Sequence, residues 1–354
     1  MLLAHQQSVN FSAARRLNHQ WRGDNFTLTV TSTTPLALDI ARFNQHEIVL
    51  DNQPPTTLNV ARVLWDEFGQ RLKDRAGELL SLTLAEETGV AVTVTATQTL
   101  FQTQSLFSAA HRTYAPALSP AENLALYGKC ANPNGHGHNY QLEVWSPSEV
   151  DLGSLLQEFD HHNLSLDLPD LLNHNVVTET LAALIARRLP QAHRIRLWET
   201  PDFFAEVWNG QRDLRLGRLY RFNAVQRLGS NLMSGQLYQV RVVLKGRLDE
   251  RTETVYDLTR LDTLAHAILE PLNGACLNDL PFFQSDSHAL IVRVLTGGSS
   301  ARMRSISSFQ TVTNLTSLSN LALYLGEQFH IKLGPVLAEL HLISDSTQSL
   351  IVTQ

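Results

Sequence analysis

The sequence predicts an α+β protein made of three tandem copies of one unit, because short patterns recur along the chain in the same order. The first pattern reads FSAARRL, FSAAHRT and FNAVQRL, at Phe11–Leu17, Phe107–Thr113 and Phe222–Leu228. A second pattern follows each copy and alternates polar with apolar residues, at Asn25–Val30, Asn139–Val144 and Leu237–Val242. Such alternation of β-branched and aromatic residues is typical of half-buried strands.

Each unit continues with a helical pattern and a second pair of strands. The helical patterns place apolar residues at helical spacing behind a capping Ser or Thr, and they start at Thr56, Val177 and Thr316. The last segments alternate on both sides of a turn, at Leu79–Val94, His193–Trp208 and Leu337–Val352. We therefore predict three domains, 1–98, 99–212 and 213–354, each ordered strand, strand, helical region, strand, strand.

Two segments are less regular than this scheme. The middle unit has only a short candidate for an additional helix, Asp151–Phe159. The third unit carries extra sequence, Ser285–Thr311, for which we predict no element.

The composition excludes several classes of function. Hydrophobic residues make up 43% of the chain and charged residues 18%, with a net charge of −6, which is typical of a folded globular protein. No basic cluster favours nucleic acid, and no apolar run reaches the roughly 20 residues that span a bilayer. Cys130 and Cys276 are too few for a disulfide framework. Residues 1–10 lack the features of a signal peptide, so we expect a cytoplasmic protein.

A histidine cluster in the middle unit indicates a catalytic metal centre. His136 and His138 flank a glycine on a predicted strand, where residues two apart point to the same face. The preceding predicted strand ends at His111, and antiparallel pairing would bring this residue beside the other two. A lone histidine on a strand is more often structural than a ligand. Three histidines that leave a fourth position open, however, form a catalytic zinc pattern.

Comparison of the three units favours the metal. At the place of His111 the first unit has Arg15 and the third has Gln226. The places of the other two histidines are taken by Arg22 and Asp24 in the first unit, and by Ser234 and Gln236 in the third. The three histidines are present together in one unit and absent together from the others. This indicates a shared function rather than a requirement of the fold.

Cys130 is a candidate catalytic thiol. A free cysteine is usually a small buried hydrophobic residue, and we interpret Cys276 in this way. Cys130, in contrast, lies six residues before His136 in a polar, loop-like segment. The charges of Lys129 and of a nearby metal ion would lower its pKa and favour the thiolate, which is a plausible base.

Two acidic features complete the set of candidates. Asp160 directly precedes His161, and such a pair orients and stabilises an imidazole that transfers protons. The carboxylate of Glu199 can accept two parallel hydrogen bonds from a planar N–C–N edge such as that of a pterin. The first unit keeps this second feature as Glu87–Thr88. Both features are more often solvated turn residues.

Together these residues resemble the 6-pyruvoyl-tetrahydropterin synthase family. The segments that carry the resemblance are Phe107–Val144, Phe159–Leu164, Val177–Leu184 and Leu197–Thr200. Their most specific part is GKC followed, after five residues, by HGHNY. The resemblance implies Zn²⁺ held by His111, His136 and His138, catalysis by Cys130, Asp160 and His161, and substrate contacts from Glu199 and Thr178.

The resemblance also implies a fold and an assembly. The family unit is a ββααββ T-fold, and three units close a twelve-stranded antiparallel barrel with the helices outside. A chain with three units is expected to close this barrel alone, as a pseudo-trimer, and to form a homodimer of pseudo-trimers. Closure removes the exposed sheet edges. The region between the HGHNY strand and Asp160 is shorter here than is usual for the family.

The implied activity is the elimination of triphosphate from 7,8-dihydroneopterin triphosphate to give 6-pyruvoyl-tetrahydropterin, without an external redox cofactor. The 6-carboxytetrahydropterin synthases of queuosine biosynthesis use the same substrate and are an alternative. The five-residue gap between Cys130 and His136 favours the pyruvoyl type. A zinc hydrolase acting on a related heterocycle is a further alternative. A non-catalytic pterin- or purine-binding T-fold protein belongs to another class, against which Cys130, Asp160 and His161 argue.

Overall fold

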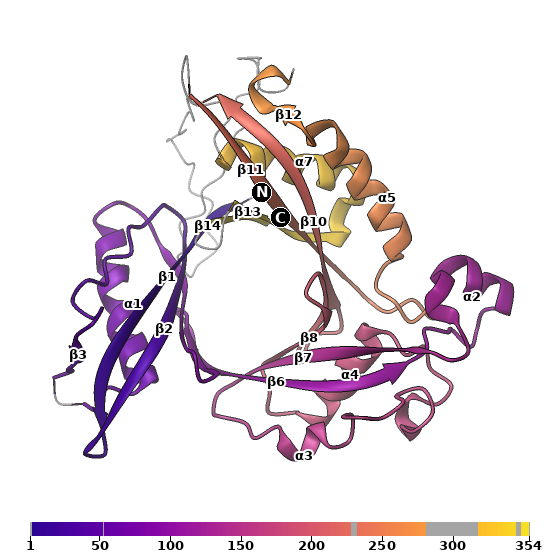
Figure 1. Cartoon of the computed structure of the whole chain (residues 1–354), viewed down its shortest axis with the longest axis horizontal. Coiled ribbons are helices and arrows are strands. Elements are labelled where there is room, and N and C mark those ends of the chain that lie inside the picture. The colour runs from indigo at the N-terminus through magenta and orange to yellow at the C-terminus, as the bar shows by residue number, and fades with distance from the viewer. Residues whose placement is uncertain (1, 52, 228–231, 281–317, 345–347, 354) are drawn as a thin grey trace, which may run out of the picture. The chain divides into compact units, whose positions relative to one another are not determined.

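The computed structural model describes residues 2–51, 53–227, 232–280, 318–344 and 348–353, and Figure 1 labels most of its elements. The helices are α1 (Thr57–Lys73), α2 (Pro120–Tyr127), α3 (Gly153–Leu156), α4 (Thr178–Arg188), α5 (Leu258–Leu269) and α7 (Leu318–Leu333). The strands of the first part are β1 (Leu2–Leu17), β2 (Gln20–Ser32), β3 (Glu47–Ile48), β4 (Leu79–Glu86) and β5 (Val90–Val94). They continue with β6 (Thr99–His111), β7 (His136–Ser146), β8 (Arg194–Thr200), β9 (Phe203–Trp208) and β10 (Leu214–Arg227). The last are β11 (Met233–Gly246), β12 (Ala275–Cys276), β13 (Leu337–Ile343) and β14 (Gln348–Thr353).

The hydrogen-bonded order of the described strands closes on itself. It runs β11, β13, β14, β1, β2, β4, β5, β6, β7, β8, β9, β10, and β10 in turn pairs with β11. Two short strands lie off this path, since β3 pairs in parallel with β1 and β12 with β10. Helix α1 packs on β4 and β5, α4 on β8 and β9, and α7 on β13 and β14. The closed order of twelve strands confirms the predicted fold class.

The chain divides into two compact units. One consists of residues 1–99, 220–242 and 265–354, and the other of residues 100–219 and 243–264. All eight predicted site residues belong to the second unit, so the site lies within one compact body. The division into 1–98, 99–212 and 213–354 stays a prediction.

One local geometry nevertheless occurs three times. Aromatic rings stack with centroids 5.1, 5.0 and 5.1 Å apart, in the pairs Phe11–Phe26, Phe107–Tyr140 and Phe222–Tyr238. In each case the next backbone N–H donates to an Asn or Asp side chain, in the pairs Ser12–Asn44, Ser108–Asp160 and Asn223–Asn273. The residue after each acceptor has a positive φ, at Gln45, His161 and Gly274. The same local geometry thus recurs once in each of the three predicted units.

The predicted helices agree with the structure to different degrees. Thr56 caps α1 as expected, and its hydroxyl accepts a hydrogen bond from the Asn59 N–H at 3.2 Å. The candidate helix Asp151–Phe159 is observed only as the four residues of α3, followed by turns. The expected helix start at Thr316 and the extra segment Ser285–Thr311 lie outside the described residues.

Helix α2 was not predicted, although the sequence carries a signal for it. Ser119 and Glu122 form a capping box, in which each side chain accepts a hydrogen bond from the other residue's backbone N–H, at 3.3 and 2.8 Å. Pro120 occupies the first turn, where its missing N–H is tolerated. Of the helices that the structure describes, none has the length and apolar character needed to cross a membrane.

Candidate metal centre and adjoining pocket

The β6–β7 ladder brings the three predicted histidines together. His111 is the register partner of His136, and His138 faces Ala109 two residues along. The ring centroids of the three histidines lie 4.4, 5.2 and 4.9 Å apart. Gly135 makes the turn into β7 with φ at +67°, and a Cβ there would lie 2.7 Å from the His111 carbonyl oxygen. Glycine is therefore required for the approach of β7 to the end of β6.

The orientation of His111 leaves one ring nitrogen available as a ligand. The ring is 1% exposed, and its Nδ1 lies 2.7 Å from the carbonyl oxygen of Val176, to which it donates. This bond puts the proton on Nδ1 and leaves the lone pair on Nε2. A hydrogen bond from the non-ligating nitrogen to a carbonyl is the usual arrangement around a bound metal.

The nitrogens that face one another fit a metal ion. In the part of the chain that is described, His111 Nε2, His136 Nδ1 and His138 Nε2 are buried without a hydrogen-bond partner. Burial lowers the pKa of His136 and of His138, which favours the neutral rings that coordinate metals. Unpartnered buried nitrogens are costly unless something binds them, and a divalent cation satisfies all three at once.

Glu199 lies at the edge of the same cluster. Its Oε1 is 3.1 Å from His138 Nε2, without the geometry of a hydrogen bond, and its Oε2 accepts a hydrogen bond from the Thr178 hydroxyl. Potential ligand atoms of the three histidines and Glu199 all lie within 4.8 Å of one another. Within the described residues this is the one such group of His, Cys, Asp or Glu side chains. Thr178 and Glu199, predicted to contact substrate, are therefore adjacent to each other and to the histidines.

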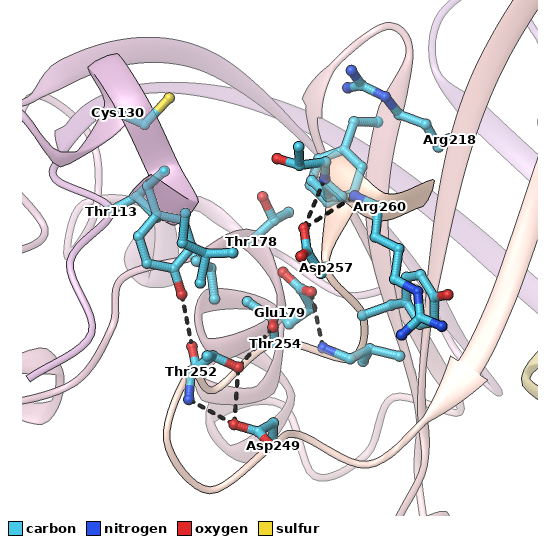
Figure 2. A pocket seen from close by; sticks show the side chains of 18 of the residues that line it. Thr113, Cys130, Thr178, Glu179, Arg218, Asp249, Thr252, Thr254, Asp257 and Arg260 are labelled. Carbon is cyan, nitrogen blue, oxygen red and sulfur yellow. Dashed lines mark hydrogen bonds between the residues drawn. The ribbon is translucent and has the colours of Figure 1, made fainter. Parts of the chain in front are cut away.

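A pocket of about 660 Å³ adjoins this cluster, because Glu199 belongs to both. Figure 2 shows this pocket with Cys130 and Thr178 among its lining side chains. Its lining includes the predicted site residues Cys130, Thr178 and Glu199, and also Glu179, which directly follows Thr178. A second wall comes from the segment 249–260, which follows β11 and enters α5. Sequence reasoning did not single out this segment. In the predicted division it belongs to the third unit, so a unit without the histidines supplies part of the pocket.

Glu179 is a pocket residue that the sequence analysis missed. Its side chain is buried, and its Oε1 accepts a hydrogen bond from the Val255 N–H at 3.2 Å. Burial raises its pKa to about 7, and the charge of Glu199 adds to the effect, while backbone hydrogen bonds oppose it. A shift of this kind in a pocket is a frequent mark of a functional site. The only sequence signal was an acidic residue directly after Thr178.

Cys130 lines the pocket, but its pKa moves against the expectation. Burial raises the pKa of its thiol, and the negative charge of Glu199 raises it further. Lys129 does lower the pKa, as predicted, but this effect is outweighed. The protein atoms alone therefore favour the thiol, and a bound cation would act in the opposite sense.

Asp160 and His161 form their predicted pair on another side of the histidines. Asp160 Oδ2 lies 2.9 Å from His161 Nδ1, and its Oδ1 accepts a hydrogen bond from the Ser108 N–H at 2.8 Å. That backbone bond is the largest cause of the lowered pKa of Asp160. The His161 side chain is 81% exposed and lines a separate hollow with His138, whereas Cys130 lines the 660 Å³ pocket. The structure thus does not place Cys130 and His161 in one cavity.

The first predicted unit holds a buried ion pair at the equivalent place. Arg15, at the position of His111, is 1% exposed and donates to Asp24 and Glu86 at 2.7 Å each. Thr57 donates to Glu86 as Thr178 does to Glu199. These contacts make Glu86, and not Glu87 as expected, the counterpart of Glu199.

The chain is similar to known pterin synthases. The family model described as 6-pyruvoyl tetrahydropterin synthase matches residues 101–210 and 226–353, more than half of the chain. The 6-pyruvoyl tetrahydrobiopterin synthase of Pongo abelii is 36% identical, with 27% of this chain and 81% of the relative covered. That of Poecilia reticulata is 38% identical, with coverages of 30% and 86%. Among solved structures, the 6-pyruvoyl tetrahydropterin synthase of Caenorhabditis elegans is 32% identical over 29% of this chain and 89% of its own, with a TM-score of 0.27.

Proposed function

The chain belongs to the 6-pyruvoyl tetrahydropterin synthase family, and we propose that it is a zinc-dependent enzyme that converts 7,8-dihydroneopterin triphosphate into 6-pyruvoyl-tetrahydropterin. The observation that carries this proposal is the convergence of three unpartnered, buried imidazole nitrogens beside a pocket lined by Cys130 and Glu199. Three neutral histidines with an open coordination position are the ligand set of a catalytic zinc site.

His111, His136 and His138 would hold the zinc ion. When bound there, Zn²⁺ supplies a Lewis acid that polarises the hydroxyls of the substrate side chain. The hydrogen bond from His111 Nδ1 to the Val176 carbonyl fixes the ring so that Nε2 faces the other two imidazoles. The protein therefore presents a preorganised site, which avoids reorganisation when the ligand binds.

Glu199 would anchor the heterocycle. A carboxylate can accept hydrogen bonds from the 2-amino group and ring N–H of a pterin, and the Thr178 hydroxyl restrains this carboxylate. Glu179, with a pKa of about 7, is half protonated near neutrality and can either accept or donate a hydrogen bond at the pocket wall.

Cys130 and the Asp160–His161 pair would move the protons. Cys130 lies in the pocket and serves as the base once its thiol is ionised, a change that a cation at the histidines favours. His161, held by Asp160 at 2.9 Å, is exposed and can exchange a proton with solvent. Triphosphate leaves by elimination, and an internal hydrogen shift balances the reaction without an external oxidant or reductant.

We further propose a cytoplasmic protein in which the three predicted units form a pseudo-trimer that pairs into a homodimer. Both cysteines are free thiols, which fits a reducing compartment. Sedimentation equilibrium measures the assembly directly, and a monomer at micromolar concentration would contradict the dimer.

The decisive experiment for the activity gives the zinc-loaded protein 7,8-dihydroneopterin triphosphate. The pterin product is identified by mass, and released triphosphate is quantified in parallel. A 6-pyruvoyl product supports the proposal, while a 6-carboxy product with acetaldehyde assigns the chain to the queuosine branch. Zinc at full occupancy without triphosphate release would rule out both synthases and favour a pterin-binding protein.

A further inference from the structure

We propose that Glu253, in the segment between β11 and α5, is a positioning residue for the metal ligand His111 and for the start of helix α4. The inference rests on the proposed function in one respect, namely that His111 is a metal ligand. It assigns a role to a residue of the predicted third unit, which lacks the histidines itself. All the residues involved belong to the compact unit of residues 100–219 and 243–264.

Both carboxylate oxygens of Glu253 contact the chain just before α4. Its Oε2 accepts a hydrogen bond from the Asn175 N–H at 2.5 Å, and its Oε1 lies 2.6 Å from His174 Nδ1. Its side chain is 23% exposed, so solvent competes only in part for these contacts. Two contacts from one carboxylate to adjacent residues define the position of this backbone more narrowly than either contact alone.

The turn that carries Glu253 is itself well ordered. The Asp249 side chain accepts hydrogen bonds from the N–H groups of Arg251 and Thr252 at 2.9 and 2.8 Å. The Glu253 N–H donates to the Asp249 carbonyl at 2.8 Å, and Glu253 has a φ of +55°. This left-handed conformation is uncommon for a residue with a side chain and indicates that the surrounding contacts hold it.

Asn175 connects the backbone held by Glu253 to the residue that contacts His111. It is fully buried, and its Nδ2 donates to the Thr252 carbonyl at 2.7 Å and to the Tyr127 hydroxyl at 2.9 Å. The next residue is Val176, whose carbonyl oxygen accepts the hydrogen bond from His111 Nδ1 at 2.7 Å. The residue whose backbone N–H is held by Glu253 thus directly precedes the residue whose carbonyl orients the ligand.

The same segment shapes the pocket wall. The Asn175 carbonyl accepts a hydrogen bond from the Thr180 hydroxyl at 2.7 Å, which ties the first turn of α4 to the held backbone. Val255, two residues after Glu253, donates its N–H to Glu179. Loss of the Glu253 carboxylate is therefore expected to loosen the orienting carbonyl of Val176, and with it the fit of His111 to a metal ion.

The test compares Glu253→Ala and Glu253→Gln with the control Glu250→Ala. Glu250 is exposed in the same turn and its removal changes the net charge equally. Each full-length protein is stripped of metal and titrated with Co²⁺, whose visible absorption reports the dissociation constant and the ligand geometry. We expect Glu253→Ala to bind Co²⁺ about tenfold more weakly, the lower end of the effect of residues that orient ligands. Its absorption band should also change.

Glu253→Gln should lose less Co²⁺ affinity than Glu253→Ala, because its amide oxygen still accepts the Asn175 N–H. Glu250→Ala should have the Co²⁺ affinity of the wild type. Circular dichroism identifies the variants that fold, and the Gln variant carries the test if the Ala variant does not fold. A folded Glu253 variant with the wild-type Co²⁺ affinity and spectrum would overturn the positioning role alone. A wild-type protein that binds no Co²⁺ would overturn the proposed function together with it.

Discussion

The guanidinium of Arg15 donates a hydrogen bond to the Glu86 carboxylate at 2.7 Å, at the place that His111 and Glu199 occupy in the next predicted unit. Asp24, at the position of His138, accepts a second bond from the same guanidinium. A fixed cation of the chain thus stands where the middle unit gathers potential metal ligands. The first unit keeps the acidic anchor, but at the places of the three histidines it has Arg15, Arg22 and Asp24.

Removing this cation should destabilise the protein strongly. Arg15→Ala leaves the buried carboxylates of Asp24 and Glu86 without their partner, and breaking a buried ion pair in this way costs about 3–5 kcal/mol. Urea unfolding followed by circular dichroism measures the change. Arg22→Ala, on the exposed part of β2, is the control and should stay within about 0.5 kcal/mol of the wild type. Equal stability of the two variants would contradict the role of Arg15.

Glu86 should make the protein sensitive to acid. Burial by itself would raise the pKa of Glu86, but hydrogen bonds from Thr57 and Arg15 and the charge of Arg15 lower it below 4.5. A carboxyl with a lowered pKa contributes stability that is present above its unfolded value and is lost as the pH falls through the folded value. The free energy of unfolding should therefore decrease below about pH 4.5, and less so in Glu86→Gln. Glu87→Gln, at an exposed position, should retain the wild-type profile.

Glu179 should have the opposite pH dependence. Its pKa of about 7 in the folded protein exceeds the ordinary 4.5, so the folded state binds the proton more tightly than the unfolded state. The contribution of Glu179 to stability is then greatest below about pH 4.5 and is lost as the pH rises through about 7. Glu179→Gln should have little effect at pH 5 and should stabilise the protein at pH 8 by on the order of 3 kcal/mol. If the stability difference between Glu179→Gln and the wild type is the same at pH 5 and pH 8, the pKa of Glu179 is not raised.

Gly135 should be the least replaceable glycine near the histidines. Gly135→Ala combines a positive φ with a Cβ 2.7 Å from the His111 carbonyl oxygen. Gly210 also has a positive φ, but no atom lies within 4 Å of its Cβ position, so Gly210→Ala isolates the backbone strain. We expect the free energy of unfolding to fall by about 1 kcal/mol in Gly210→Ala. In Gly135→Ala it should fall further, and metal binding should be weakened. Thermal unfolding and Co²⁺ titration measure the two effects, and similar values for both variants would argue against the steric conflict.

Cys130 should be separable from metal binding. Cys130→Ala removes the proposed base but none of the three imidazoles, so zinc content should stay at about one ion per chain. Turnover of 7,8-dihydroneopterin triphosphate should fall by at least about 100-fold, the usual effect of removing an acid–base group. His136→Ala should instead lose both zinc and turnover. Full activity in Cys130→Ala would assign the proton transfer to another group.

Much of this arrangement follows from local rules. His136 and His138 share a face because residues two apart on a strand do so. The strands β6 and β7, which are consecutive in the sheet, pair with His111 opposite His136. The absence of all three histidines from the other units already pointed to a common role. The cap of α1 at Thr56 and the alternating strands could likewise be predicted from the sequence, because caps and alternation depend on neighbours in the chain.

The sequence by itself predicted the repeated unit, and it determined the strand pairing around the histidines and the family, since these depend on residue spacing within one segment of the chain. Only the tertiary structure decided which distant side chains meet. Glu253 reaches Asn175 across 78 residues, and Glu86 rather than Glu87 reaches Arg15. It also decided that burial and Glu199 raise the pKa of Cys130 despite Lys129. Desolvation and contacts between remote segments depend on how the chain packs, and no local pattern encodes them.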